Sequence, residues 1–388
     1  MYAYLRNIKY VCLLKYTSIN LVIWEYIMRR IPLRYLKENS ITAMDIYNSS
    51  GKLLISKSMK IDKNMMELLH KNKIIYVYIM DESREDIIDD VISPELRREA
   101  VLELKKMSYE FSNLTSIKRN KEINNVYIEK ILNLVNRIID ELLNKNSLTI
   151  EQIDIRDFEN QYFQHSVNVA VVSLIIGIEL NYDIDKLRRL GIAAILHDLG
   201  YAFLPKEIIY KSTKLSNDEE EVVKTHSEKG YNYLYLYTDV SRDVLFPILY
   251  HHEHVDGSGY PRGIKGNRIN EYSKIIAIVD FYDKLVNSEL ILQSDLPNNI
   301  LERIMAHIGT AFDYKIVEVF YKKAIPFLKG TMLKLSNGDI VLVEGTINGF
   351  PSRPIVRVLQ SDDNSKINKC INLVDVLNGS IDKIIYYL

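Results

Sequence analysis

Six of the chain's eight histidines lie between residues 165 and 254. The adjacent pair His251-His252 and the nearby His254 come just before a loop with the sequence Gly257-Ser258-Gly259-Tyr260-Pro261. Neighbouring imidazoles cannot both pack on one apolar face, whereas imidazole nitrogen is the commonest metal ligand in proteins. The pair therefore predicts a metal site beside a substrate-binding loop. A solvated, histidine-rich turn is the alternative that this stretch leaves open.

Four further segments carry residues that could bind a metal ion. His165 precedes an apolar helical pattern, His197-Asp198 ends the apolar run at 193–196, His226 follows an acidic run, and Asp280 closes the apolar run at 275–279. Burying the Asp198 carboxylate without a partner costs several kcal/mol, and a metal ion is the simplest partner. A capped helix end, a surface histidine and a satisfied polar residue explain each segment taken singly. Their joint occurrence favours a metal centre.

The bulk composition narrows the class of protein that must position these residues. A length of 388 residues suggests two or three domains, and 47% hydrophobic with 26% charged residues is ordinary for a globular protein. The net charge of -1 offers no basic surface, which excludes binding to duplex nucleic acid through its phosphates. Cys12 and Cys370 form neither a disulfide framework nor a thiolate zinc site. We therefore expect a cytoplasmic protein.

Residues 1–30 form an atypical N-terminal extension. Its apolar stretch from Val11 to Met28 is interrupted by Lys15 and Glu25, so it lacks the run of about 18 apolar residues that a membrane span needs. Membrane insertion is not expected, although a short amphipathic anchor is the alternative. Translation from Met28 is a further hypothesis.

Small β-containing regions are predicted on both sides of a long helical part. Residues 31–80 predict an α+β domain, with a hairpin of strands 42–47 and 52–56, a helix from Asp62 to His70, and a strand over 74–80. Residues 81–150 predict a helical linker, whose helices over 95–117 and 125–144 could form a homodimer. Residues 151–326 have helical periodicity, and 327–388 predict a small β-rich domain. The expected fold class is mainly α, flanked by small β-containing domains.

The order of the histidines and acids resembles the HD-GYP group of the HD-superfamily phosphohydrolases over residues 155–326. The matching residues, in order, are His165, His197-Asp198, His226, His251-His252-Glu253, Asp256-Gly257-Ser258-Gly259-Tyr260-Pro261 and Asp280. The resemblance implies an all-helical domain with two or three iron or manganese ions. It also implies hydrolysis of a 3'-5' phosphodiester in cyclic di-GMP, or in a related cyclic dinucleotide, to pGpG or GMP.

The resemblance assigns a role to each matching position. It implies one metal ion held by His165, His197, Asp198 and Asp280. Asp198 then bridges to a second ion held by His226, His251 and His252, and a hydroxide between the ions attacks phosphorus. Histidine and carboxylate without thiolate suit iron or manganese and do not exclude zinc.

The loop after the histidine pair is expected to bind the substrate. The residues concerned are Gly257, Gly259, Tyr260, Pro261 and Arg262. Gly257 and Gly259 can adopt positive φ and bring backbone amides close to a ligand, and Tyr260 can stack on a base. Without the resemblance, the same loop would be interpreted as a plain turn.

The chain departs from the family's pattern where basic residues hold the phosphate. Tyr201 replaces the lysine of His-Asp-x-Gly-Lys, and Glu289 and Leu292 replace two later cations. Lys284 stands where the family has alanine, and it could compensate, as could Arg262, Lys265 or Arg268. Tyr201 and His254 are candidate proton donors to the leaving oxygen.

These departures keep other functions open. Gln161 replaces the glutamate of a third-metal site, which favours two ions. One alternative is a sensor or interaction module that keeps the metal centre but does not hydrolyse a substrate. The other is a phosphohydrolase that acts on another nucleotide.

Overall fold

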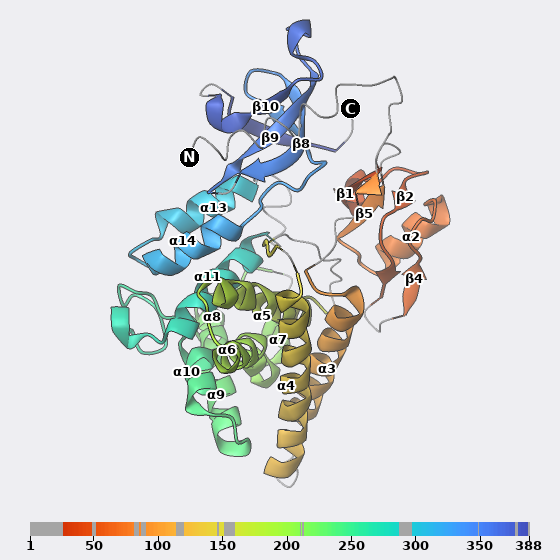
Figure 1. Cartoon of the computed structure of the whole chain (residues 1–388). Helices are drawn as coiled ribbons and strands as arrows, with labels where there is room; N and C mark the ends of the chain where they lie inside the picture. The colour runs from red at the N-terminus through yellow and green to blue at the C-terminus, as the bar shows by residue number, and fades with distance from the viewer. Residues whose placement is uncertain are drawn as a thin grey trace.

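The computed structural model describes residues 26–48, 52–80, 85–86, 91–113, 120–145, 147–150, 160–209, 211, 213–286, 297–347, 349–376 and 379–386. A body of helices carries two small β regions, one from each end of the chain, along the same side (Figure 1). The predicted fold class, mainly α with β-containing flanks, is confirmed.

The N-terminal β region begins earlier than the predicted start at residue 31. Its first strand, β1 (Tyr26–Pro32), pairs antiparallel with β5 (Tyr76–Met80) and parallel with β6 (Glu85–Asp86), and β2 (Ile41–Thr42) pairs with the other edge of β5. The predicted helix is confirmed as α2 (Lys63–Lys71), because the Asp62 side chain accepts a hydrogen bond from the Met65 N–H.

The predicted hairpin is confirmed only for residues 46–47, which pair with residues 53–55. β3 (Ile46–Tyr47) pairs antiparallel with β4 (Leu53–Ile55), but Thr42 belongs to β2 in the other sheet. The chain bends between β2 and β3, where the Asp45 carboxylate accepts a hydrogen bond from the Lys57 N–H. A single strand over 42–47 is therefore a wrong prediction, since this bend divides it.

The helices of the body run from residue 94 to residue 323. They are α3 (Pro94–Asn113), α4 (Lys121–Leu143), α5 (Gln161–Glu179), α6 (Ile184–Leu196), α7 (Lys206–Ile209), α8 (Asn217–Lys224), α9 (His226–Tyr237), α10 (Arg242–Tyr250), α11 (Glu271–Val286), α13 (Pro297–Ala306) and α14 (Tyr314–Lys323). The body also contains the short 3-10 helices η3 (Leu199–Phe203) and η4 (Gly266–Arg268). Three more lie in the β regions, namely η1 (Leu33–Tyr35), η5 (Asn364–Lys366) and η6 (Leu373–Asp375).

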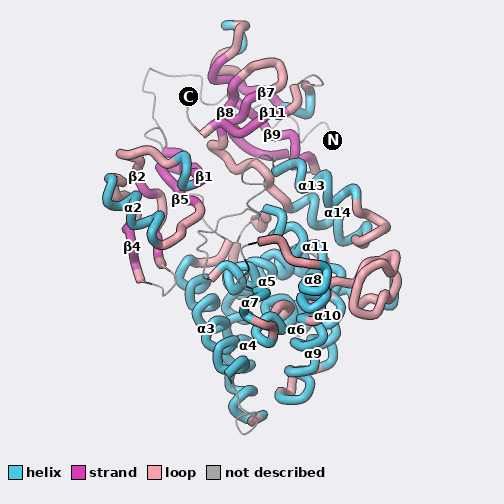
Figure 2. Tube along the Cα trace, turned by 180° about the vertical axis from the view of Figure 1, so that it is seen from behind, coloured by secondary structure: helices cyan, strands magenta, loops and turns pink. Residues whose placement is uncertain are grey.

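α3 and α4, which lie within the predicted helical linker over 81–150, pack as part of this body. Their buried residues Leu104, Val135 and Ile138 lie in the same continuous hydrophobic core as Leu174 of α5 and Ile195 of α6. The two helices lie side by side (Figures 1 and 2). Their apolar faces are thus used inside the chain, and a homodimer through these helices stays a prediction.

α5 lies in the middle of the body (Figure 1). It is the one described helix with the length and hydropathy of a membrane span, and 67% of its most apolar window is buried inside the protein. A helix that is apolar on all sides needs neighbours on all sides, and α3, α6, α11 and α14 all contact it.

The C-terminal β region is an antiparallel sheet of five strands in the order β10-β9-β8-β7-β11. The strands are β7 (Met332–Leu335), β8 (Ile340–Ile347), β9 (Phe350–Gln360), β10 (Cys370–Asn372) and β11 (Ile381–Ile385). The sheet has its own core, which includes Phe327, Val341 and Val356. The ring of Tyr386 stacks on that of Tyr35, 5.0 Å away, so the two β regions contact each other.

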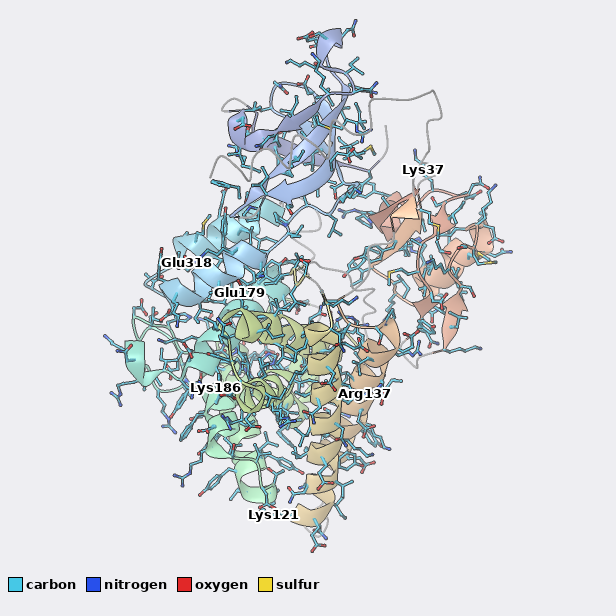
Figure 3. The ribbon with its side chains drawn as sticks, in the orientation of Figure 1. Lys37, Lys121, Arg137, Glu179, Lys186 and Glu318 are labelled. Atoms are coloured by element: carbon cyan, nitrogen blue, oxygen red, sulfur yellow. The ribbon has the colours of Figure 1, made fainter. Side chains whose placement is uncertain are left out.

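Charged side chains cover the outside of the helical body, as the labelled Lys121, Arg137 and Lys186 illustrate (Figure 3). Arg137 of α4 forms an ion pair of 2.7 Å with Glu99 of α3. Exposed pairs of this kind contribute about 0–1 kcal/mol each, so the buried apolar faces dominate the packing of these helices.

Candidate metal centre

Helix ends bring the predicted ligands together. His197 caps the C-terminus of α6, Asp198 follows it, His226 is the first residue of α9, and His251-His252 come directly after α10. His165 and Asp280, by contrast, lie within α5 and α11. Seven predicted ligands from five segments thus meet in one place.

The seven residues form two groups of four that share Asp198. The first group consists of His165, His197, Asp198 and Asp280, and the second group consists of Asp198, His226, His251 and His252. Within each group the potential ligand atoms all lie within 4.8 Å of one another. All of these residues are buried except His252, which is half-buried.

The two carboxylate oxygens of Asp198 face different groups. Oδ2 lies 3.5 Å from His165 Nε2 and 3.3 Å from His197 Nε2. Oδ1 lies 3.3 Å from His226 Nε2 and 3.6 Å from His251 Nε2. This is the arrangement that a carboxylate needs in order to bridge two cations.

Hydrogen bonds fix which nitrogen of each ring faces the cluster. Nδ1 of His197, His226 and His251 lies 2.7–2.8 Å from the backbone carbonyl oxygen three residues earlier in each case. His165 Nδ1 instead lies 2.6 Å from the carboxylate of Asp283. Because these oxygens only accept, Nδ1 of each ring carries a proton, and Nε2 is the nitrogen directed at the cluster.

The polar atoms of the cluster fit divalent cations. Buried atoms without a hydrogen-bond partner include Nε2 of His197, Nε2 of His252 and Oδ1 of Asp198. The Nε2 atoms of His226 and His251 lie 3.2 Å apart, and two lone pairs at that distance repel each other. A cation beside them would turn this repulsion into coordination.

The pKa shifts agree with a cluster that attracts positive charge. Burial alone would lower the pKa of His165, but its hydrogen bonds to Asp198, Asp280 and Asp283 raise it to about 10. Without a metal ion the carboxylates therefore favour a proton on this ring, a charge that a bound cation would replace. Burial lowers the pKa of His251 to about 4, which keeps that ring in the neutral form that binds metals.

A chain of side chains reaches from the first group to α3. The carboxylate of Asp283 that contacts His165 also accepts a hydrogen bond of 3.3 Å from Asn168 Nδ2, and Arg97 of α3 donates to Asn168 Oδ1. Arg97, Asn168 and Asp283 are not among the site residues predicted from the sequence. For Asp283 a signal exists, because it lies one helical turn from Asp280.

Two residues that depart from the family's pattern lie at this cluster. Tyr201 of η3 stacks on the His226 ring, with centroids 4.5 Å apart, and burial raises its pKa, so the phenol stays neutral. Lys284 of α11 places its ammonium 2.7 Å from Asp280 Oδ1. Glu289 and Leu292, the other two departures, lie outside the described residues.

A buried acid shapes the loop that follows the histidine pair. The side chain of Glu253 accepts hydrogen bonds from the backbone N–H groups of Arg262, at 2.7 Å, and of Ile264, at 3.0 Å. Tyr260 stacks on His252, with centroids 4.6 Å apart, and precedes the cis peptide bond to Pro261. The loop is thus fixed against the second group.

The two predicted loop glycines are needed for different reasons. Gly257 has a φ of +83°, as expected. Gly259 is not among the positive-φ residues, which corrects that expectation. A Cβ at position 259 would instead lie 2.4 Å from both His252 O and His254 N, so the close approach of the loop's own backbone requires a glycine there.

His254 and Arg262, the remaining predicted residues, have partners outside the two groups. His254 Nδ1 lies 2.9 Å from Ser258 Oγ in the loop, and His254 belongs to neither group of four. The Arg262 side chain is 62% exposed and pairs with Glu228 of α9 at 3.4 Å. Roles for these two residues in proton donation and substrate binding stay predictions.

The backbones of η3 and α9 touch at two glycines. A Cβ on Gly200 would lie 1.8 Å from the carbonyl oxygen of His226, and one on Gly230 would lie 3.1 Å from Gly200 N. Gly200 follows Asp198 by two residues, and Gly230 follows His226 by four. This contact therefore holds the bridging carboxylate beside the second group.

Comparison with known proteins identifies relatives of the helical body. Residues 140–316 match the model of a family described as HD domain. The chain is similar to Cyclic di-GMP phosphodiesterase PA4108 of Pseudomonas aeruginosa, with 26% identity over 54% of this chain and 50% of that protein. It is also similar to Cyclic di-GMP phosphodiesterase PdeB of Borreliella burgdorferi, with 24% identity over 58% of this chain and 60% of that protein.

A third relative carries a different substrate in its name. The 3'3'-cGAMP-specific phosphodiesterase 1 of Vibrio cholerae is 32% identical over 42% of this chain and 37% of that protein. The chain spans about half the length of the relatives that it matches.

Proposed function

The helical domain of this chain belongs to the HD-GYP group of the HD domain family, and from this membership we propose that the chain is a metal-dependent phosphodiesterase of cyclic dinucleotides. The observation that carries the proposal is the division of the two Asp198 oxygens between two groups of buried ligands. We further propose cyclic di-GMP as the substrate, with hydrolysis of a 3'-5' phosphodiester to pGpG or GMP.

Two divalent ions, when bound, supply a nucleophilic water near neutral pH and compensate charge on the phosphoryl oxygens. The residues that would hold them are His165, His197 and Asp280 for one ion, His226, His251 and His252 for the other, and Asp198 for both. We propose iron or manganese, because the ligands are imidazoles and carboxylates without thiolate.

Residues around the cluster prepare the site for the reaction. The backbone carbonyls and Asp283 hold the ligand rings in the tautomer that exposes Nε2. The phenol of Tyr201 stays protonated because it is buried, so it has a proton to donate to the leaving oxygen. Glu253 fixes the loop that carries Tyr260, whose ring lies beside the second group.

A turnover assay with alternative substrates tests this proposal. Full-length protein reconstituted with ferrous iron or manganese is incubated in parallel with cyclic di-GMP and 3'3'-cGAMP, and products are separated by chromatography. We expect cyclic di-GMP to be hydrolysed and activity to vanish in Asp198→Ala. Faster turnover of 3'3'-cGAMP would keep the reaction class but replace the substrate.

A binding module is the second candidate, and the replacement of a lysine by Tyr201 favours it. A phosphate-binding lysine contributes a charge that a neutral phenol lacks. A protein with both ions bound, with affinity for cyclic di-GMP and without turnover would establish this alternative. The cytoplasmic location and the homodimer stay proposals that fractionation and sedimentation would test.

A further inference from the structure

Lys284 places a positive charge at the edge of the candidate metal centre. Its ammonium lies 2.7 Å and 2.9 Å from the two oxygens of Asp280 and 3.8 Å from Asp198 Oδ2. The Lys284 side chain is 42% exposed, whereas the side chains of Asp198 and Asp280 are 5% exposed. Lys284 thus contacts the two buried carboxylates with a side chain that is partly open to solvent.

The carboxylate oxygens nearest to the ammonium also face the histidines of the first group. Asp280 Oδ1 lies 2.9 Å from His165 Nε2, and Asp198 Oδ2 lies 3.3 Å from His197 Nε2. A divalent ion on these oxygens would compete with the lysine for them and repel its charge. Asp280 Oδ2 would remain as one partner of the ammonium, whose other two N–H groups would then be available to a ligand.

A lysine is suited to this change of partner. Its ammonium sits on a flexible stem of four carbons, so it can move outward by rotation without movement of α11. A phosphate bound to the ions would carry negative charge. A charge-assisted hydrogen bond from the ammonium to a phosphate oxygen would replace the contacts given up to the ions.

Two other cations near the site have partners elsewhere. Arg262 pairs with Glu228, and Lys224 pairs with Glu221 at 2.5 Å. Within the part of the chain that the structure describes, Lys284 is the lysine or arginine that forms ion pairs with the cluster carboxylates. Tyr201 of η3 contributes no charge, because burial keeps its phenol neutral by raising its pKa.

We propose that Lys284 is the phosphate-binding residue of this site, and that its ammonium moves from the carboxylates to a non-bridging phosphate oxygen once the ions are bound. The inference rests on the proposed phosphodiesterase function. It assigns to α11 the positive charge that the family's pattern has at position 201. It also explains how the site binds an anionic diester although Tyr201 is neutral.

The test compares Lys284→Met and Lys284→Arg in the full-length, manganese-loaded protein. Lys186→Met is the matched control, because Lys186 lies on the outer surface (Figure 3) and its loss changes the net charge equally. The affinity for inorganic phosphate is measured by calorimetry, KM and kcat with cyclic di-GMP by chromatography, and bound manganese by elemental analysis.

Lys284→Met is expected to weaken phosphate binding and to raise KM by about tenfold to a hundredfold, the effect of one charge-assisted contact. Lys284→Arg should recover most of this loss, and bound manganese should not fall in either variant. Unchanged phosphate affinity and KM in Lys284→Met would overturn the proposal. Loss of manganese from this variant would also overturn it, since Lys284 would then only support the ligands.

The phosphate measurement separates this inference from the proposed function. If the wild-type protein hydrolyses no cyclic dinucleotide but Lys284→Met still binds phosphate more weakly, the phosphodiesterase proposal fails and the role of Lys284 stands. If the wild-type protein with manganese bound does not bind phosphate at all, the role of Lys284 is wrong.

Discussion

The two groups of the candidate metal centre share Asp198 but are oriented in different ways. In the second group, His226 and His251 are each held by the carbonyl oxygen three residues earlier in the chain. In the first group, His165 is held by Asp283 from another helix, and that carboxylate depends in turn on Asn168. Local backbone therefore orients His226 and His251. It also orients His197 of the first group, whereas His165 depends on side chains that only the tertiary fold brings together.

Replacing Asp198, which the two groups share, should affect both groups alike. Asp198→Ala deletes a ligand from both, so we expect both ions to be lost and activity to fall by more than the roughly 100-fold that loss of an outer partner causes. Elemental analysis and turnover of cyclic di-GMP measure the two effects. Asp362→Ala, an exposed change in the C-terminal β region, is the control and should retain both properties.

Replacing one histidine in each group should show that the two groups bind their ions independently. His165→Gln is expected to lose the ion of the first group alone, and His251→Gln the ion of the second group alone, because each ring belongs to one group. Metal content per chain, measured after dialysis, should fall by about half in each variant. Loss of all metal from both variants would show that the groups bind as one unit.

Asp283→Asn should weaken the first group only. The amide keeps the shape but removes the negative charge that polarises His165, and loss of such an outer carboxylate weakens metal affinity by about 10–100-fold. Titration against a chelator should show one weakened and one unchanged ion. The second group offers no equivalent side chain to mutate at His226 or His251, since backbone carbonyls orient these rings.

Arg97→Met should have the smallest effect, because two residues, Asp283 and Asn168, lie between Arg97 and His165 in the chain of contacts. Removing its donor deprives the buried Asn168 amide of one partner, which destabilises folding by about 1–3 kcal/mol. Thermal denaturation measures this, with the exposed Arg137→Met as control at about 0–1 kcal/mol. Equal destabilisation by the two variants would argue against a buried connection from α3.

The distinction between local contacts and tertiary contacts also explains which site residues could be predicted from the sequence. His251-His252 and the loop after them are contiguous, so their types and spacing indicate a metal site directly. Asp283 and Lys284 follow Asp280 by three and four residues in one helix, and that spacing could have placed them at the cluster. Arg97 is 71 residues from Asn168, and no local pattern connects the two.

Prediction of the fold from the sequence is limited in the same way, because local patterns do not reveal tertiary contacts. The helix α2 was predictable because its cap, Asp62, lies beside it in the sequence. The inclusion of α3 and α4 in the helical body was not, because an amphipathic helix has the same pattern whether its apolar face meets its own chain or a second copy. Gly259 likewise looks like a turn glycine, although the carbonyl of His252 is what excludes a side chain there.

The contact between Gly200 and Gly230 is a main-chain contact that fixes the spacing of the two ligand groups. A methyl group at position 200 would collide with the carbonyl oxygen of His226, so α9 would have to shift and carry that ligand away from Asp198. Gly200→Ala would leave every ligand in the sequence and still separate the two groups. The distance between the two ligand groups is thus determined by two residues that have no side chain.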